Sequence, residues 1–295
     1  MNPAVITHRV AFTPAELAEL QSLDLPETDG QPMDSDWQRI ETTFLIEVGR
    51  HHFRHQKTGY FGGNMCFYYS LKQARHLEFL GPDFFFVKDA EPHKLRKKWE
   101  IWKENNLFPN VIVEYLSPST QANDLGKKKT IYERTFQTRE YFVYEPDDVT
   151  LLGWRLSPIT NLYEPIEADE DGRLYSDELN LLIGPWHGTL HGQTTTWLRF
   201  FDEDGSLVLS PEEEERRQKT EERQQKQLAQ RIAKEENAAR KEERAAKEAA
   251  LADKEAALAD KEAALAAKEA ERLAKEAAFA EIERLKKLLE SRPTH

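Results

Sequence analysis

The chain has 295 residues, 39% of them hydrophobic, and a formal net charge of -12 at pH 7. Residues 211–295 carry 20 basic and 21 acidic residues, which leaves 21 basic and 32 acidic residues, a net charge of -11, in residues 1–210. This acidic balance argues against a general polyanion-binding protein, because affinity for nucleic acid ordinarily shows as a basic surface.

Cysteine content and hydropathy narrow the class of protein further. Cys66 is the only cysteine, so an intrachain disulfide and a cysteine-based zinc site are excluded. No run approaches about 18 apolar residues, and the N-terminus lacks a basic region followed by an apolar one. We therefore expect no export and no membrane span, and a single cysteine is typical of a reducing cytoplasm.

Two helices are predicted near the N-terminus. The first begins at Thr13, followed by Pro14 at the first helical position and by Glu16, which completes a capping box. The second runs from Asp34 to about His55, with apolar residues spaced for one buried face. It also carries two acids, Glu41 and Glu47, for which a solvated position is the simplest interpretation.

Two apolar runs then predict buried strands, and each carries one carboxylate at its edge. Asp83 begins the run Asp-Phe-Phe-Phe-Val, and Glu114 nearly ends the run Val-Ile-Val-Glu-Tyr. A buried, unpaired carboxylate costs several kcal/mol, so two acids placed in this way need a common reason. If the strands are neighbours, a divalent cation bridging Asp83 and Glu114 supplies it. The alternative is two ordinary acids at strand ends.

A helix is predicted over residues 123–135, and strands follow it up to residue 210. Asp124, Lys128 and Tyr132 are four residues apart and share one face of this helix, so Lys128 could reach the same centre as the two acids. The alternative is an exposed ion pair between Asp124 and Lys128.

The order of these motifs resembles that of a known family. The motifs are Gly-Pro-Asp-Phe-Phe (81–85), Glu-x-Leu-Ser-Pro-Ser-Thr (114–120), Asp-x3-Lys-x3-Tyr (124–132) and Glu-Tyr-Phe (140–142). They are similar to those of the putative restriction endonuclease family abundant in cyanobacteria, a branch of the PD-(D/E)xK nuclease superfamily. The resemblance covers most of residues 30–210.

This resemblance implies an α/β (α+β) fold with a mixed β-sheet flanked by helices, and a Mg²⁺-dependent phosphodiesterase site that acts on DNA and in which Mn²⁺ substitutes. We expect no organic cofactor. Nucleases of this superfamily often place an additional acid on the first core helix, so the resemblance implies that Glu41 or Glu47 could approach the metal from behind. By position, Asp83 matches the aspartate of the PD motif and Glu114 the acid of the (D/E)xK motif. Leu116 stands where that motif has its lysine, so the following helix would provide the basic group, as Lys128 or else as Lys127 or Lys129.

The last 85 residues predict one long helix that begins at Ser210 and Pro211. From Ala249 a seven-residue repeat favours a coiled coil, although its leucines and its alanines lie on different sides of the helix. We expect moderate self-association, strongest at an apolar patch near the end; a solitary helix is the alternative. The patch is formed by Phe279, Ile282, Leu285, Leu288 and Leu289.

These patterns predict an N-terminal extension (1–30), a nuclease-like domain (31–210) and a long Ala/Glu/Lys-rich helix (211–295). The first functional hypothesis is a Mg²⁺-dependent DNA endonuclease that forms homo-oligomers through its helix. The second is a catalytically idle nuclease fold that serves as an interaction module. DNA binding by so acidic a domain needs a local basic cluster, for which the candidates are Arg96, Lys97, Lys98, Lys103 and Lys127 to Lys129.

Overall fold

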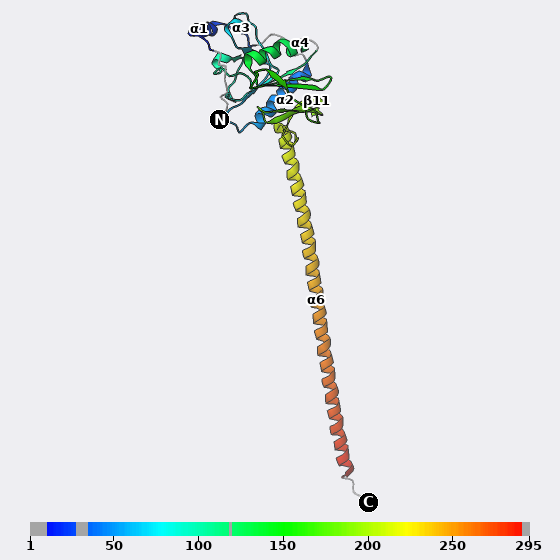
Figure 1. Ribbon diagram of the computed structural model, residues 1–295. Coiled ribbons are helices and arrows are strands. Elements are labelled where there is room, and N and C mark those ends of the chain that lie inside the picture. The colour runs from blue at the N-terminus through cyan, green and yellow to red at the C-terminus, as the bar shows by residue number, and fades with distance from the viewer. Residues whose placement is uncertain (1–10, 28–34, 118–119, 291–295) are drawn as a thin grey trace. The chain divides into compact units, whose positions relative to one another are not determined.

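The computed structural model describes residues 11–27, 35–117 and 120–290 of the chain (Figure 1). The domain boundary expected near residue 30 lies outside the described residues, as do Pro118 and Ser119 of the Glu-x-Leu-Ser-Pro-Ser-Thr motif. The chain divides into two compact units, Met1–Arg217 and Gln218–His295.

The two N-terminal helices are capped by their own sequences. Helix α1 (Pro14–Ser22) has the predicted capping box, in which the Glu16 N–H donates to Thr13 Oγ1 and the Glu16 carboxylate accepts the Thr13 N–H. Helix α2 (Asp36–His52) is capped by Ser35 and is slightly shorter than predicted. Its buried face contains Phe44, Leu45 and Val48.

A six-stranded mixed sheet forms the centre of the first unit, as predicted. Strands β5 and β6 are parallel, and every other neighbouring pair in this sheet is antiparallel. In spatial order the strands are β1 (Tyr60–Gly62), β3 (Phe84–Val87), β5 (Val111–Tyr115), β6 (Glu140–Glu145), β7 (Thr150–Leu156) and β8 (Tyr163–Pro165).

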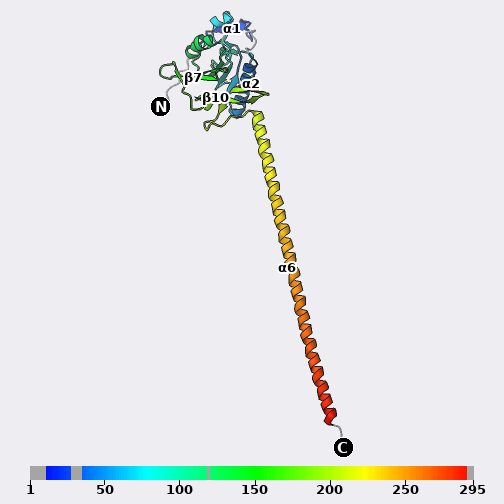
Figure 2. The ribbon, with the colours of Figure 1, turned by 90° about the vertical axis from the view of Figure 1, so that its right-hand side faces the viewer.

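One face of this sheet packs against α2 and a second sheet, as side chains alternate along each strand. Val111 and Val113 of β5 join a core with α2 and with the three-stranded sheet, and Figure 2 shows α2 beside β10. That smaller sheet has the order β11 (Gln193–Phe201), β10 (Leu181–Leu190) and β9 (Leu174–Ser176).

The opposite face of the sheet is covered by the helical segment between β5 and β6. Ile112 of β5 packs there with Tyr132 and Phe136. This segment was predicted as one α-helix over 123–135, but it alternates between α and π turns; the Lys129 N–H, for example, donates to Asp124 O, five residues back. Its parts are α4 (Gln121–Asn123), η2 (Asp124–Lys128), α5 (Lys129–Ile131) and η3 (Tyr132–Phe136).

Short elements complete this side of the domain. The parallel pair β2 (Phe67–Tyr68) and β4 (Trp99–Glu100) adds Phe67 and Trp99 to the core that contains Ile112, Tyr132 and Phe136. The remaining elements of the domain are α3 (Leu71–Arg75) and the 3-10 turn η1 (Ile101–Lys103).

Helix α6 (Pro211–Glu290) runs for 80 residues, as its composition predicts. Every side chain from Gln218 to Lys287 is exposed, and ion pairs four residues apart, such as Glu243 with Lys247, line the helix. The expected apolar patch is exposed at Phe279, and the side chains of Leu288 and Leu289 lie outside the described part. Within the described ranges no helix is both long and apolar enough to cross a membrane.

Candidate active site

The two strand acids lie opposite each other in the sheet. Phe84 of β3 pairs with Val113 of β5 in antiparallel register, and the same register places Asp83 across from Glu114. Directly opposed residues project from the same face of a sheet. The backbone N–H of Asp83 lies 3.4 Å from Glu114 Oε2, so the Glu114 carboxylate reaches the start of β3.

Neutral donors hold both carboxylates in place. The Tyr115 N–H donates to Asp83 Oδ2 (2.7 Å), and Gln38 of α2 donates to Asp83 Oδ1 (2.6 Å). The Tyr132 hydroxyl donates to Glu114 Oε1 (2.7 Å). These bonds satisfy buried acceptors without adding positive charge.

Lys128 brings an ammonium group to Glu114. Its Nζ lies 3.2 Å from Glu114 Oε2 and 2.8 Å from Asp124 Oδ1. Asp124 is only 1% exposed, so the alternative of a surface ion pair is wrong. Of the two other candidate lysines, Lys127 is exposed, and Lys129 places its ammonium 3.5 Å from the centroid of the Trp154 ring.

The site brings three acids to the ammonium of Lys128, namely Asp83, Glu114 and Asp124. Burial raises the pKa of Glu114 to about 8, and the neighbouring Asp83 and Asp124 add to this effect. Burial also raises the pKa of Asp83. For Lys128 burial works in the opposite direction, but Glu114 and Asp124 outweigh it and raise the lysine pKa, so Lys128 is a cation at neutral pH.

The two acids of α2 differ in their surroundings. Glu47 is exposed. Glu41 is fully buried and accepts the Leu198 N–H of β11 at 3.1 Å, while burial raises its pKa to about 8. Glu41 is therefore directed toward the smaller sheet, and the residue of α2 that contacts Asp83 is Gln38.

The backbone of Gly63 and Asn64 packs against the start of β3. A Cβ added to Gly63 would lie 2.2 Å from Asp83 O, and the Asn64 N–H donates to Pro82 O at 2.8 Å. Close approach of neighbouring atoms, and not an unusual backbone angle, accounts for Gly62 and Gly63, because neither has positive φ.

The basic cluster predicted at residues 96–98 and at Lys103 is not an open cationic face. Arg96 is 2% exposed and pairs with Glu104. Lys98 donates to Leu25 O, and Lys103 pairs with Glu100. Lys97 pairs with Glu27. The prediction overlooked the acids that lie close to these cations in space.

Sequence reasoning named Asp83, Glu114, Lys128 and Tyr132, and the structure brings all four together. It missed Gln38, whose contact with Asp83 spans 45 positions. No local signal marks this glutamine, because its role depends on how α2 packs against the sheet. Among the described residues, no group of three or more His, Cys, Asp or Glu side chains is arranged to hold a metal ion.

A mixed sheet that places an Asp and a Glu on neighbouring strands beside a lysine defines a nuclease-like domain. The family model Uma2, described as "Putative restriction endonuclease", matches residues 29–190, more than half of the chain. The chain belongs to this family.

The crystal structure of a "putative nuclease belonging to DUF820" from Anabaena variabilis ATCC 29413 is similar to 55% of this chain and to 89% of its own, with 15% sequence identity and a TM-score of 0.38. No curated protein matches the chain.

Proposed function

We propose that the protein is a metal-dependent DNA endonuclease in which Asp83 and Glu114 bind Mg²⁺ and Lys128 provides the catalytic cation. The observation that carries this proposal is the convergence of two acids from neighbouring strands with one ammonium, 3.2 Å from Glu114. Family membership supports the reaction class and DNA as the substrate.

The donor set suits Mg²⁺, and Mn²⁺ as its substitute. Mg²⁺ binds through one or two carboxylates and takes its other ligands from water and phosphate oxygens. Each oxygen of Asp83 and Glu114 has two lone pairs, so the hydrogen bonds from protein donors leave capacity for a cation. Burial raises the pKa of Glu114 and of Asp83, and a divalent cation beside them would favour their ionised forms. When bound, such an ion supplies Lewis-acid activation of a phosphate and of a water.

The protein groups around this site position charge. Lys128, held between Glu114 and Asp124, presents a fixed ammonium where negative charge develops on the phosphate during hydrolysis. Its raised pKa makes it an electrostatic stabiliser rather than a proton acceptor. Tyr132 and Gln38 keep the two acids oriented without competing for protons.

The direct test is cleavage of supercoiled plasmid by the full-length protein with Mg²⁺, with Mn²⁺ and with EDTA. We expect nicking with either metal, and a loss of at least about 100-fold in Asp83→Asn, Glu114→Gln and Lys128→Met. Lys127→Met is the matched control, because it removes an exposed cation one position away. Cleavage that persists in Asp83→Asn would remove the enzyme proposal.

A second candidate function is an idle nuclease fold that serves as an interaction module. It is favoured by the contacts that already fill the site, since both Asp83 oxygens and both Glu114 oxygens accept protein donors. Calorimetric titration with Mn²⁺ separates the two functions. Binding that Glu114→Gln abolishes supports the enzyme, and no binding by the wild type supports the module.

We further propose that α6 pairs with a second copy of the chain, so that two sites can cut two strands. Leu251, Leu258 and Leu265 repeat every seven residues and are 53–59% exposed, which leaves apolar surface for a partner helix. Sedimentation of residues 1–217 against the full chain tests this role, and identical oligomeric states would refute it.

A further inference from the structure

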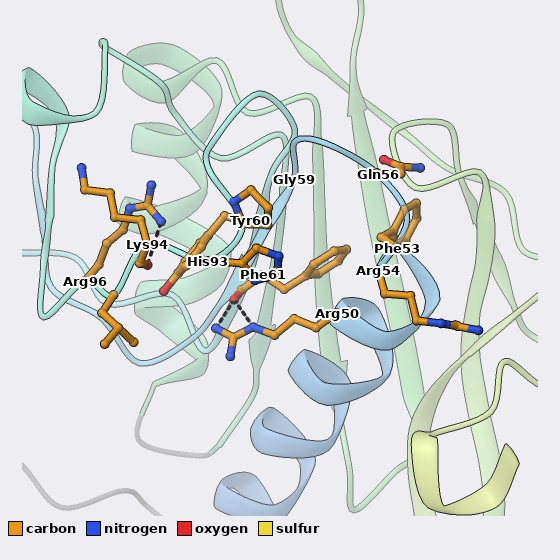
Figure 3. Close-up of a pocket in the computed structure, with 12 residues that line it drawn as sticks. Arg50, Phe53, Arg54, Gln56, Gly59, Tyr60, Phe61, His93, Lys94 and Arg96 are labelled. Atoms are coloured by element: carbon orange, nitrogen blue, oxygen red, sulfur yellow. Dashed lines mark hydrogen bonds between the residues drawn. The ribbon is translucent and has the colours of Figure 1, made fainter. Parts of the chain in front are cut away.

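The domain has a cavity that is lined by basic side chains and not by Asp83 or Glu114. This cavity of about 420 Å³ lies between the end of α2, β1 and residues 92–96 (Figure 3). Arg50 and Arg54 of α2 line it together with Lys94 and Arg96. No Asp or Glu is among the described residues that line it.

Arg96 is a fixed, buried cation in this cavity. Its side chain is 2% exposed, and its guanidinium lies 4.4 Å from the centroid of the Tyr60 ring. Within the described ranges its buried Nε has no hydrogen-bond partner. Arg50 approaches the same ring, with its guanidinium 5.6 Å from the centroid, and Figure 3 shows it donating to Phe61 O from the α2 side.

The charges in the cavity are not balanced. Lys94 and Arg96 share one carboxylate, that of Glu104, at 2.7 and 2.9 Å. The hydrogen-bond acceptor of Arg50 is the Phe61 carbonyl, which neutralises no charge. Arg54 lies 3.8 Å from Glu214, so the excess positive charge of the cavity comes from Arg50 and from the pair Lys94 and Arg96. This excess lies within a stretch of chain whose net charge is -11.

We propose that this cavity binds a phosphate group, and that in the working protein the phosphate belongs to the nucleic-acid strand held at Asp83 and Glu114. Guanidinium groups bind phosphate oxygens through paired, charge-assisted hydrogen bonds. Assignment to that strand rests on the proposed nuclease function, whereas phosphate binding by the cavity does not.

A neighbouring cavity extends from the first toward the start of β3. It has a volume of about 700 Å³, shares Arg50, Arg54 and Tyr60 with the first, and is lined also by Glu47 and by Gly63, which packs against the Asp83 carbonyl. This continuity favours an extended strand as the occupant over a small free anion.

Helix α2 sets the spacing between the two contacts. Gln38, which bonds to Asp83, and Arg50 are both in α2, and 12 residues of α-helix span about 18 Å. A strand of B-form DNA advances 3.4 Å per nucleotide, so about five nucleotides separate the two contacts.

The test measures binding by the full-length protein in EDTA. The probes are inorganic phosphate and adenosine monophosphate, followed by calorimetry, and duplexes of 4 and 12 base pairs, followed by fluorescence anisotropy. The variants are Arg50→Gln and Lys94→Gln, and circular dichroism confirms that they fold. Arg39→Gln is the matched control, because it removes the same charge from an exposed position of α2 outside the cavity.

We expect Arg50→Gln and Lys94→Gln to weaken binding of phosphate and of the 12-base-pair duplex by about tenfold, as for loss of one charge-assisted hydrogen bond. Arg39→Gln should bind every probe with nearly the affinity of the wild type. Affinity for the 4-base-pair duplex should change little in any of the variants. If the variants lose only the free anions, the cavity binds phosphate but the strand assignment is overturned. The cavity proposal is overturned if Arg50→Gln and Lys94→Gln bind the probes as tightly as the wild type and Arg39→Gln do. It is also overturned if the wild type binds none of the probes.

These outcomes are independent of catalysis. Phosphate binding that depends on Arg50, in a protein that does not nick plasmid, retains the cavity and rejects the nuclease. If Arg50→Gln nicks plasmid normally and binds phosphate and DNA as the wild type does, the nuclease is retained and the cavity proposal is rejected.

Discussion

Burial of Glu41 predicts a strong pH dependence of domain stability. The side chain is fully buried, and its pKa is raised to about 8 from an ordinary value of 4.5. The folded state therefore holds a proton that the unfolded state releases above pH 4.5. Stability from this group is fully present below pH 4.5, falls as the pH rises, and is lost above pH 8. The difference of about 3.5 pH units, at 1.36 kcal/mol each, amounts to about 5 kcal/mol.

Glu41→Gln keeps the shape of the neutral carboxyl and removes its titration. We expect the free energy of unfolding of the wild type to fall between pH 5 and pH 9 by about 4 kcal/mol more than that of the variant, in urea denaturation followed by near-ultraviolet circular dichroism. The comparison cancels contributions from Glu114 and other buried acids. Glu47→Gln, an exposed change in the same helix, is the control. Equal pH slopes for wild type and Glu41→Gln would show that Glu41 is ionised in the fold, which would restore it as a candidate metal ligand.

Three further substitutions have defined consequences. Gly63→Ala places a methyl group 2.2 Å from Asp83 O, so we expect the start of β3 to shift and metal affinity, measured by calorimetry, to fall at least about tenfold. Tyr132→Phe removes the hydrogen bond to the buried acid and should lower the free energy of unfolding by about 1–3 kcal/mol. Arg199→Ala removes a fully buried guanidinium that pairs with the acid at the start of α6, and should cost about 3–5 kcal/mol in urea denaturation, as for other large buried side chains cut to alanine; a cost below about 1 kcal/mol would contradict this.

The sequence predicted those elements of the fold that depend on residues close together in the chain. The capping box at Thr13 and Glu16, the start of α6 at Pro211 and the runs that form β3 and β5 are all local, and the structure has each of them. The π turns within Gln121–Phe136 were not predictable, because periodicity alone fits an ordinary α-helix.

The candidate site shows the same division. Asp83 and Glu114 could be found because acids are rare in apolar runs, whereas the contact from Gln38 depends on packing between distant elements. The basic run at Arg96 was misread for a related reason. Its partner Glu104 is only eight positions away, but folding buries the pair, so a pattern that suggested an exposed cationic patch became part of a cavity wall.

The position of the lysine provides a last test of the site. Leu116 is two residues beyond Glu114, so its side chain projects from the same face of the sheet, into the core that contains Tyr132. If catalysis needs an ammonium beside Glu114 and not Lys128 itself, the double variant Lys128→Met/Leu116→Lys should recover about tenfold or more of the nicking activity that Lys128→Met loses. Burial of the new lysine costs stability, so urea denaturation must confirm that the double variant is folded under the assay conditions. A folded double variant no more active than Lys128→Met would mean that the helix must supply the cation, because Asp124 fixes its position there at 2.8 Å.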